Sequence, residues 1–180
     1  MKHCGTKIIN TERLLLRPFL YDDCNDMLKN WTSNSTVQAS YGEPIYTSEE
    51  EVIELLEKWI NQYNDLEFYR WAIIEKERNE NIGQIAFCKV YSNCNTAEIE
   101  YCIGENFWGK GYAGEALSAI IEFTFSNTGF TKLEAFHRIN NIKSGRVLQK
   151  SSMQITDTVQ RFIVRNQLPE GEVCYAIIKN

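Results

Sequence analysis

The sequence predicts an α+β (mixed α/β) domain in which one mixed, mostly antiparallel sheet carries helices on both faces. The first observation is size and composition. The 180 residues, 43% hydrophobic and 24% charged, fit a single domain spanning 1–180 with its core at about 9–179. The second is a run of three strand-like segments, at 68–75, 82–91 and 97–103, which reads as an antiparallel meander. The third is a later strand–helix–strand succession, which adds one crossover and hence parallel pairing.

The chain opens with a strand followed by a short helix. Residues 11–19 have an apolar centre that ends at Pro18, a pattern typical of a strand. Residues 21–31 are predicted to be helical, because Asp22 and Asp23 place negative charge where a helix N-terminus favours it.

A second helix is predicted over residues 48–64. Ser48 is a suitable N-cap, and Glu51 stands three residues later as its capping-box partner. One apolar stripe with helical spacing follows, made of Val52, Leu56, Trp59, Ile60 and Tyr63.

The strand at 97–103 alternates between two faces. One face carries Ala97, Ile99, Tyr101 and Ile103, and the other carries Glu98, Glu100 and Cys102.

The C-terminal part alternates helices and strands. We expect helices over 112–127 and 141–151, and strands over 132–139, 155–165 and 173–179. The last two strands are expected to form a hairpin around Pro169-Glu170-Gly171.

Composition excludes several classes of function. The 19 Lys and Arg against 24 Asp and Glu give a net charge of −5, which disfavours a nucleic-acid-binding surface. No stretch approaches the roughly 18 apolar residues of a membrane span, and the N-terminus lacks the apolar core of a signal peptide. We therefore expect a cytoplasmic protein with no membrane partner. Its six cysteines are expected to be reduced, and they are Cys4, Cys24, Cys88, Cys94, Cys102 and Cys174.

A glycine-rich segment precedes the helix at 112–127. Gly109, Gly111 and Gly114 match G-x-G-x-x-G, and such a loop at a helix N-terminus presents N–H groups to an anion such as a pyrophosphate. The alternative is a tight turn without a ligand. A dinucleotide fold is disfavoured, because the acidic Glu134 stands near the beginning of its strand and the preceding strands form a meander. A Walker loop is excluded, since no Gly-Lys-Ser/Thr follows.

Two runs in the chain, AEIEYCIGENFWGKGYAGEAL and NNIKSGRVLQKSSM, are similar to motifs of the GNAT N-acetyltransferase superfamily. The resemblance extends from TERLLLRPF to the final strand and is closest to the RimJ/RimL-like branch of ribosomal-protein-alanine acetyltransferases. It implies the GNAT acyl-CoA N-acyltransferase fold, with the sheet splayed between the strands at 97–103 and 132–139. It also implies acetyl-CoA as co-substrate and a possible homodimer.

The resemblance implies a set of cofactor-binding residues. The pyrophosphate would bind the loop formed by Trp108, Gly109, Lys110, Gly111, Tyr112, Ala113 and Gly114. The pantetheine would pair with the backbone of Tyr101, Cys102 and Ile103. Asn141 and Ser144 match the Asn-x-x-Ser that contacts the cofactor arm and the thioester.

Three positions depart from the family pattern. Trp108 stands where the loop usually has Gln or Arg, and we expect binding to survive because backbone N–H groups hold the phosphates. Ser152 replaces a Gly before Met153. Leu148 occupies the position of a Tyr general acid found in some members, so Ser144 becomes the candidate for that role.

Acetyl transfer to an amine requires a group that accepts the amine proton. Glu98 and Glu100 project from one face of the strand beside the thioester, and proximity could raise one pKa. His137 is the other candidate. The alternatives are a solvated strand face for the carboxylates, a structural role for His137, and a helix-capping role for Ser144. A strand N–H near Cys102 or Ile103 could stabilise the oxyanion.

The sequence leaves the acceptor open. The predicted activity is direct transfer of acetyl from acetyl-CoA, in a ternary complex, to a primary amine of a protein N-terminus or a small molecule. The acceptor pocket is expected from the helices at 21–31 and 48–64 and the loop between them. The alternative is a non-catalytic acyl-CoA-binding or sensing module on the same fold. No His/Cys/acid cluster has ligand spacing, so no metal is expected, and His3 and Cys4 are placed in a mobile tail.

Overall fold

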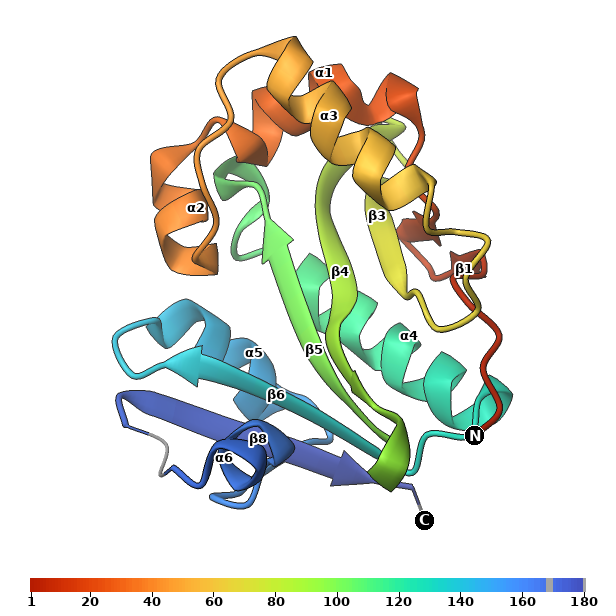
Figure 1. The fold of residues 1–180 in the computed structure, drawn as a ribbon. Coiled ribbons are helices and arrows are strands. Elements are labelled where there is room, and N and C mark those ends of the chain that lie inside the picture. Colours follow the sequence, from red (N-terminus) through yellow and green to blue (C-terminus); the bar gives the residue numbers. More distant parts are fainter. Residues whose placement is uncertain (168–169, 180) are drawn as a thin grey trace.

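A computed structural model describes residues 1–167 and 170–179. Its strands form one eight-stranded sheet in the order β1-β2-β3-β4-β5-β6-β8-β7 (Figure 1). The strands are β1 (Ile9–Asn10), β2 (Leu14–Arg17), β3 (Arg70–Glu75), β4 (Glu80–Tyr91), β5 (Thr96–Ile103), β6 (Lys132–Arg138), β7 (Gln154–Ile155) and β8 (Glu172–Ile178). The α-helices are α1 (Cys24–Met27), α2 (Ser35–Tyr41), α3 (Glu49–Ile60), α4 (Tyr112–Asn127), α5 (Ile142–Lys150) and α6 (Gln160–Arg165).

Neighbouring strands pair antiparallel everywhere except between β5 and β6, which run parallel. That parallel pairing covers only Thr96↔Lys132, Ala97↔Leu133 and Glu98↔Glu134. Beyond Glu98 the two strands diverge, as Figure 1 shows. The predicted mixed, mostly antiparallel sheet, splayed between these two strands, is therefore confirmed.

Two apolar clusters cover opposite faces of the sheet. On one face α4 and α5 pack on the strands through residues such as Leu117, Ile120 and Leu148. On the other face α1, α2 and α3 pack through residues such as Met27, Val37 and Leu56. A smaller cluster places α6 against the C-terminal strands. The alternation predicted for β5 holds, because its odd-numbered apolar residues lie in the first cluster and Cys102 lies in the second.

Local signals placed several elements correctly. The helix α4 has the predicted bounds. The capping box of α3 forms as expected, with Glu51 N donating to Ser48 Oγ at 3.3 Å and Ser48 N donating to Glu51 Oε2 at 3.2 Å. The segment at 21–31 is helical, but it divides into a 3-10 turn, α1 and a π-helical turn that ends at Thr32.

The helix α2 was missed by the sequence analysis. Asn34 caps it, since its Oδ1 accepts from Thr36 N at 2.9 Å and Val37 N at 3.1 Å. Gly42, with φ of 88°, ends it. Asn34 and Gly42 are helix-boundary signals, but the seven residues between them are too few for a clear helical stripe.

The strand predicted over 155–165 is wrong. The segment contains the two-residue strand β7 and then, at Gln160, the helix α6. Val159 and Phe162 are both buried and lie three residues apart, which is the spacing of a helix. In the sequence alone, so short an apolar run is compatible with either a helix or a strand. β7 does pair antiparallel with β8, but α6 lies in the connection, and Pro169 of the expected turn lies outside the described residues.

The N-terminal segment packs on the sheet instead of forming a free tail. Its backbone bonds to two distant loops, since Gly129 N donates to Lys2 O at 2.8 Å and Gly5 N donates to Leu66 O at 2.9 Å. His3 contacts Tyr69, with 3.3 Å between His3 Nδ1 and the Tyr69 hydroxyl. All six cysteines carry free thiols.

Candidate active site

The glycine loop between β5 and α4 forms an open cradle. Gly109 and Gly111 have φ of 78° and 84°, values that favour glycine over residues with a Cβ. A Cβ built on Gly109 or Gly114 would meet no atom within 4 Å, so open space adjoins the backbone there. No side chain caps the N-terminus of α4. Its first N–H groups are thus available to an anion, and the loop fits a pyrophosphate.

An ion pair fastens this loop to β2. Arg13 donates through Nε to Glu115 Oε2 at 2.7 Å and through Nη1 to the Lys110 carbonyl at 2.8 Å. Thr11 Oγ1 adds a bond of 2.6 Å to Glu115 Oε1. The Arg13 guanidinium also stacks on Tyr112, 4.7 Å from the ring centre. The sequence analysis missed Arg13 and Glu115 because they are 102 positions apart.

The splay leaves part of β5 with a free edge. Tyr101, Cys102 and Ile103 pair with β4 on one side, and among the described residues no strand pairs with them on the side toward β6. Trp108 closes one end of this edge, since its Nε1 donates to the Ile103 carbonyl at 2.7 Å. Lys143 Nζ lies 3.7 Å from the centre of the Trp108 ring. The Ile103 carbonyl assigned to the pantetheine therefore already has one partner.

Asn141 and Ser144 divide two roles at the start of α5. Asn141 Oδ1 accepts from Ser144 N at 3.2 Å, so Asn141 is the N-cap. The Ser144 hydroxyl is left for Tyr101, whose hydroxyl oxygen lies 3.0 Å away on β5. Burial raises the pKa of Tyr101 to about 12, so this pair is neutral at physiological pH.

Glu98 and Glu100 share a face of β5 but have different surroundings. Glu98 lies where β5 still pairs with β6 and is only 4% exposed. It lies 3.8 Å from Arg161 Nη1, and burial raises the pKa of its carboxyl. Glu100 lies beyond the last β6 pair and accepts from the Tyr41 hydroxyl at 2.7 Å and from Arg70 Nη2 at 2.9 Å. Only Glu100 therefore stands beside the splayed part of the sheet.

His137 lies on the opposite face of the sheet from both carboxylates. Its Nδ1 donates to the Arg138 carbonyl at 2.8 Å, and its ring packs near Tyr175. The helix α5 presses on the ring so closely that a Cβ on Gly145 would lie 2.8 Å from His137 Cε1. The structure therefore does not bring His137 together with Glu98 and Glu100.

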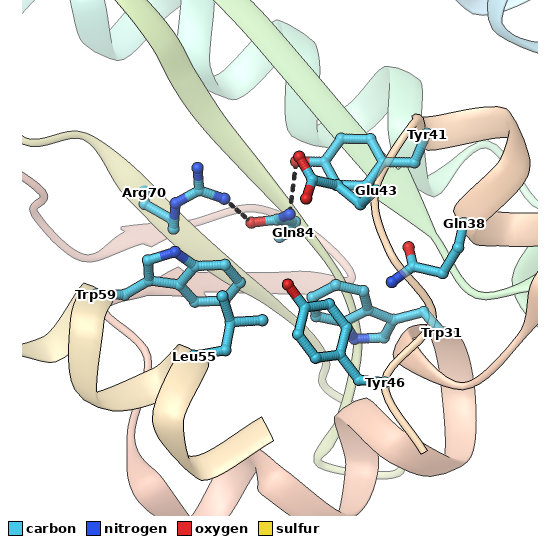
Figure 2. A pocket seen from close by; sticks show the side chains of 9 residues that line it. All are labelled: Trp31, Gln38, Tyr41, Glu43, Tyr46, Leu55, Trp59, Arg70 and Gln84. Carbon is cyan, nitrogen blue, oxygen red and sulfur yellow. Dashed lines mark hydrogen bonds between the residues drawn. The ribbon is translucent and has the colours of Figure 1, made fainter. Parts of the chain in front are cut away.

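A cavity of about 100 Å³ lies on the Glu100 side of the sheet (Figure 2). It is lined by Trp31, Gln38, Tyr41, Glu43, Tyr46, Leu55, Trp59, Arg70 and Gln84. Its position agrees with the predicted one, between the helices at 21–31 and 48–64 and their connection, although that connection contains α2. Gln84 sits directly opposite Cys102 in the β4–β5 register and donates to the Tyr41 hydroxyl at 2.6 Å. The cavity thus lies over β3 and β4, beside Cys102 of β5.

The sequence analysis missed most residues of this cavity. Tyr41 and Gln38 belong to the unpredicted α2, and Arg70 and Gln84 come from two different strands. No local motif could have joined them.

Within residues 1–167 and 170–179, no three or more His, Cys, Asp or Glu side chains are grouped so that they could hold a metal ion. Over the same ranges, every helix is too short or too polar to span a bilayer.

The chain is similar to several known proteins. Residues 13–154 match the family model described as an acetyltransferase (GNAT) domain. The uncharacterized N-acetyltransferase YoaA of Bacillus subtilis is 28% identical over 172 residues, which cover 96% of this chain and 97% of YoaA. The uncharacterized N-acetyltransferase p20 of Bacillus licheniformis is 30% identical, with 80% of each chain covered.

Solved structures share the fold. A GNAT-family acetyltransferase from Bacillus anthracis is 26% identical, covers 96% of this chain and 99% of its own, and superimposes with a TM-score of 0.77. The apo structure of RimL, a ribosomal L7/L12 α-N-protein acetyltransferase, has the same TM-score of 0.77 at 20% identity. It covers 96% of this chain and 94% of its own, and at that identity the likeness concerns the fold alone.

Proposed function

Because this chain belongs to the GNAT family of N-acetyltransferases, we propose that it transfers acetyl from acetyl-CoA directly to a primary amine within one ternary complex. The observation that carries the proposal is the three-pair contact between β5 and β6. It frees the edge of β5 beside both the glycine loop and Ser144. An extended pantetheine arm can pair with that edge while its pyrophosphate binds at the N-terminus of α4.

The residues fit this cofactor in three places. The open space at Gly109 and Gly114 leaves room for the pyrophosphate. Tyr101 and Ile103 offer backbone groups on the free edge, and the Ile103 carbonyl keeps a second lone pair beside the one that Trp108 uses. The backbone of Cys102 faces β4 instead, since its carbonyl lies against Gly83. Ser144 reaches the gap from α5.

The chemistry then assigns each proton. The neutral amine attacks the thioester carbon, the C–N bond forms and the C–S bond breaks. We assign acceptance of the amine proton to Glu100, because its carboxylate bonds to Tyr41 and Arg70, which line the cavity. Glu98 instead lies under α6 and His137 under α5. Ser144 donates a proton to the leaving thiolate and takes one in turn from the Tyr101 hydroxyl, its hydrogen-bond partner. Solvent restores the proton of Tyr101 and accepts the one held by Glu100 when the products leave. The N–H of Ile103 is the donor for the oxyanion, because the Cys102 N–H faces β4.

The acceptor class in this proposal is a protein N-terminal α-amine or a small-molecule amine. The net charge of −5 favours an acceptor that carries a positive charge before it reacts.

Thermal unfolding with acetyl-CoA, CoA or NADH is the direct test. A ligand held only by the native state raises the midpoint, so both CoA compounds should raise it and NADH should not. Thiol release with a panel of amines and peptides then measures turnover. The absence of a shift with either CoA compound would contradict the proposal. Binding without turnover of any amine would support a non-catalytic acyl-CoA module instead.

A matched pair of glycine variants locates the binding site. Gly109→Ala puts a methyl group into the open cradle and also strains a backbone with φ of 78°. Gly171→Ala imposes similar strain at φ of 68°, near β8 and with no atom near its Cβ. We expect only Gly109→Ala to weaken CoA binding, by about tenfold, which corresponds to one lost charge-assisted hydrogen bond. Equal affinity in the two variants would contradict the placement of the pyrophosphate.

A further inference from the structure

The cavity in Figure 2 has one polar side and one apolar side. Glu43, Gln38 and Gln84 project toward it on one side, and Trp59 and Leu55 close it on the other. Such a division suits a ligand with one polar end and an apolar body.

A buried acceptor on the polar side has no partner. Gln38 is 1% exposed, and its Nε2 donates to the Pro44 carbonyl at 2.7 Å. Its Oε1, fixed by that bond, receives no hydrogen bond from the described residues. A buried acceptor without a hydrogen bond is unfavourable, so a ligand that donates a hydrogen bond here is favoured.

The charges around the cavity leave an excess of negative charge. Arg70 is the cation: its Nη atoms bond to Glu100 and Gln84 and its guanidinium stacks on Trp59 at 4.5 Å, while its Nε has no hydrogen-bond partner among the described residues. Glu43 adds a second carboxylate, and no ion pair neutralises it among the described residues. An ammonium ion is attracted to this site, whereas a carboxylate is repelled.

The size of the cavity limits the apolar body. At about 100 Å³ it is smaller than the 300–1,000 Å³ typical of sites for larger ligands. An apolar cavity of about 150 Å³ holds benzene, so this one takes a body of only a few carbon atoms.

We infer that this cavity selects a small primary alkylamine without a carboxylate, an inference that rests on the proposed acetyl transfer. The amine end lies among Gln38, Glu43 and Gln84, and Gln84 is paired with Cys102 of β5. The alkyl body lies between Trp59 and Leu55. A peptide N-terminus does not fit, because the main chain that follows its first residue needs more room.

The test compares acceptors that differ in one feature. Wild-type enzyme is assayed by thiol release with 3-methylbutylamine, with leucine, which adds only the carboxylate, and with an alanine-initiated tetrapeptide. We expect kcat/KM for 3-methylbutylamine to exceed that for leucine by about 100-fold, since repulsion between like charges costs several kcal/mol. We expect the peptide to be poorer still. A preference for leucine or the peptide overturns the inference.

Two variants test the cavity itself. Glu43→Gln removes the charge at an exposed position with little risk to folding, and Leu55→Trp fills the apolar side. Each should raise KM for 3-methylbutylamine at least about tenfold, the effect expected from the loss of one charge-assisted hydrogen bond in Glu43→Gln or of the apolar space in Leu55→Trp. The CoA dissociation constant, measured by calorimetry, should change less than twofold. Glu122→Gln, the same charge change on the exposed side of α4, should match wild type.

The outcomes separate the two levels of the proposal. Unchanged KM in Glu43→Gln overturns the inference even if Leu55→Trp fails to fold. CoA binding with turnover of the peptide alone overturns the inference and leaves the acetyl transfer intact. Failure of CoA binding, or of turnover with every acceptor, overturns the proposed function and the inference with it.

Discussion

The hydroxyl oxygens of Tyr101 and Ser144 lie 3.0 Å apart, in a hydrogen bond that joins β5 to α5 across the splayed part of the sheet. The bond exists because Asn141 has taken over the capping of α5 and leaves the Ser144 hydroxyl free. Ser144 is therefore oriented toward the gap in which the thioester is proposed to lie.

We expect Ser144→Ala to lower kcat about 100-fold, the usual contribution of a positioned general acid, with CoA affinity changed less than threefold. Steady-state kinetics and calorimetry measure the two quantities. Ser151→Ala is the control, since it removes a hydroxyl at the other end of α5, where it bonds to the Leu148 carbonyl at 2.7 Å. An unchanged kcat in Ser144→Ala would remove Ser144 from the mechanism.

Glu100→Gln should also lower kcat about 100-fold, because a glutamine cannot accept the amine proton. Glu98→Gln and His137→Asn should stay within about fivefold of wild type, since neither side chain adjoins the cavity. Steady-state kinetics of the three variants, with CoA affinity measured by calorimetry, provide the check, because only Glu100→Gln should lose turnover while it still binds CoA. A larger effect from Glu98 or His137 would move the proton acceptor to that residue.

Arg13→Met should weaken CoA binding about tenfold, because the loop loses two charge-assisted hydrogen bonds that hold it in shape. Arg13→Lys should recover little, since an ammonium cannot reach Glu115 and the Lys110 carbonyl with the same forked geometry. The predicted signature is a raised KM for acetyl-CoA with kcat nearly unchanged. Arg165→Met, at an exposed position on α6, is the control. A fall in kcat with KM unchanged would contradict this positioning role.

Trp108→Phe tests the departure of this loop from the family pattern. It removes the indole N–H that donates to Ile103 and keeps an aromatic ring beside Lys143. We expect a loss of about 0.5–1.5 kcal/mol in stability, typical of one hydrogen bond, with CoA affinity within threefold of wild type. Denaturant unfolding and calorimetry measure these changes. Loss of CoA binding would show that Trp108 is itself part of the cofactor site.

Burial gives Glu98 a raised pKa, which makes stability depend on pH. The folded protein holds this proton more tightly than the unfolded chain, so stability falls as pH rises from about 4.3 through the folded-state pKa. Glu98→Gln removes the ionisation, and Arg161 keeps Glu172 as a partner at 3.4 Å. The variant should therefore unfold at a higher temperature than wild type at pH 7, by about 2–4 °C for each kcal/mol that the ionised Glu98 costs the folded state. The difference should vanish below about pH 4. A lower midpoint at pH 7 would contradict this.

Patterns along the chain were sufficient where an element depends on its own residues. The bounds of α4, the capping box of α3 and the alternation of β5 all depend on positions a few residues apart, and each was predicted correctly. The glycine loop was recognised for the same reason. The segment at 155–165 failed because a short apolar run satisfies both strand and helix until its neighbours are known.

The sequence by itself determined the fold class, the family resemblance and the position of the glycine loop, because these depend on local spacing. Only the tertiary structure decided which candidates share a site. It separated His137 from the carboxylates by the thickness of the sheet, and it gave Glu98 and Glu100 different neighbours although they stand two residues apart. It also assembled the cavity from α2, α3 and two strands. Packing decides such contacts, since residues distant in the chain meet only where the sheet order and the helices bring them together.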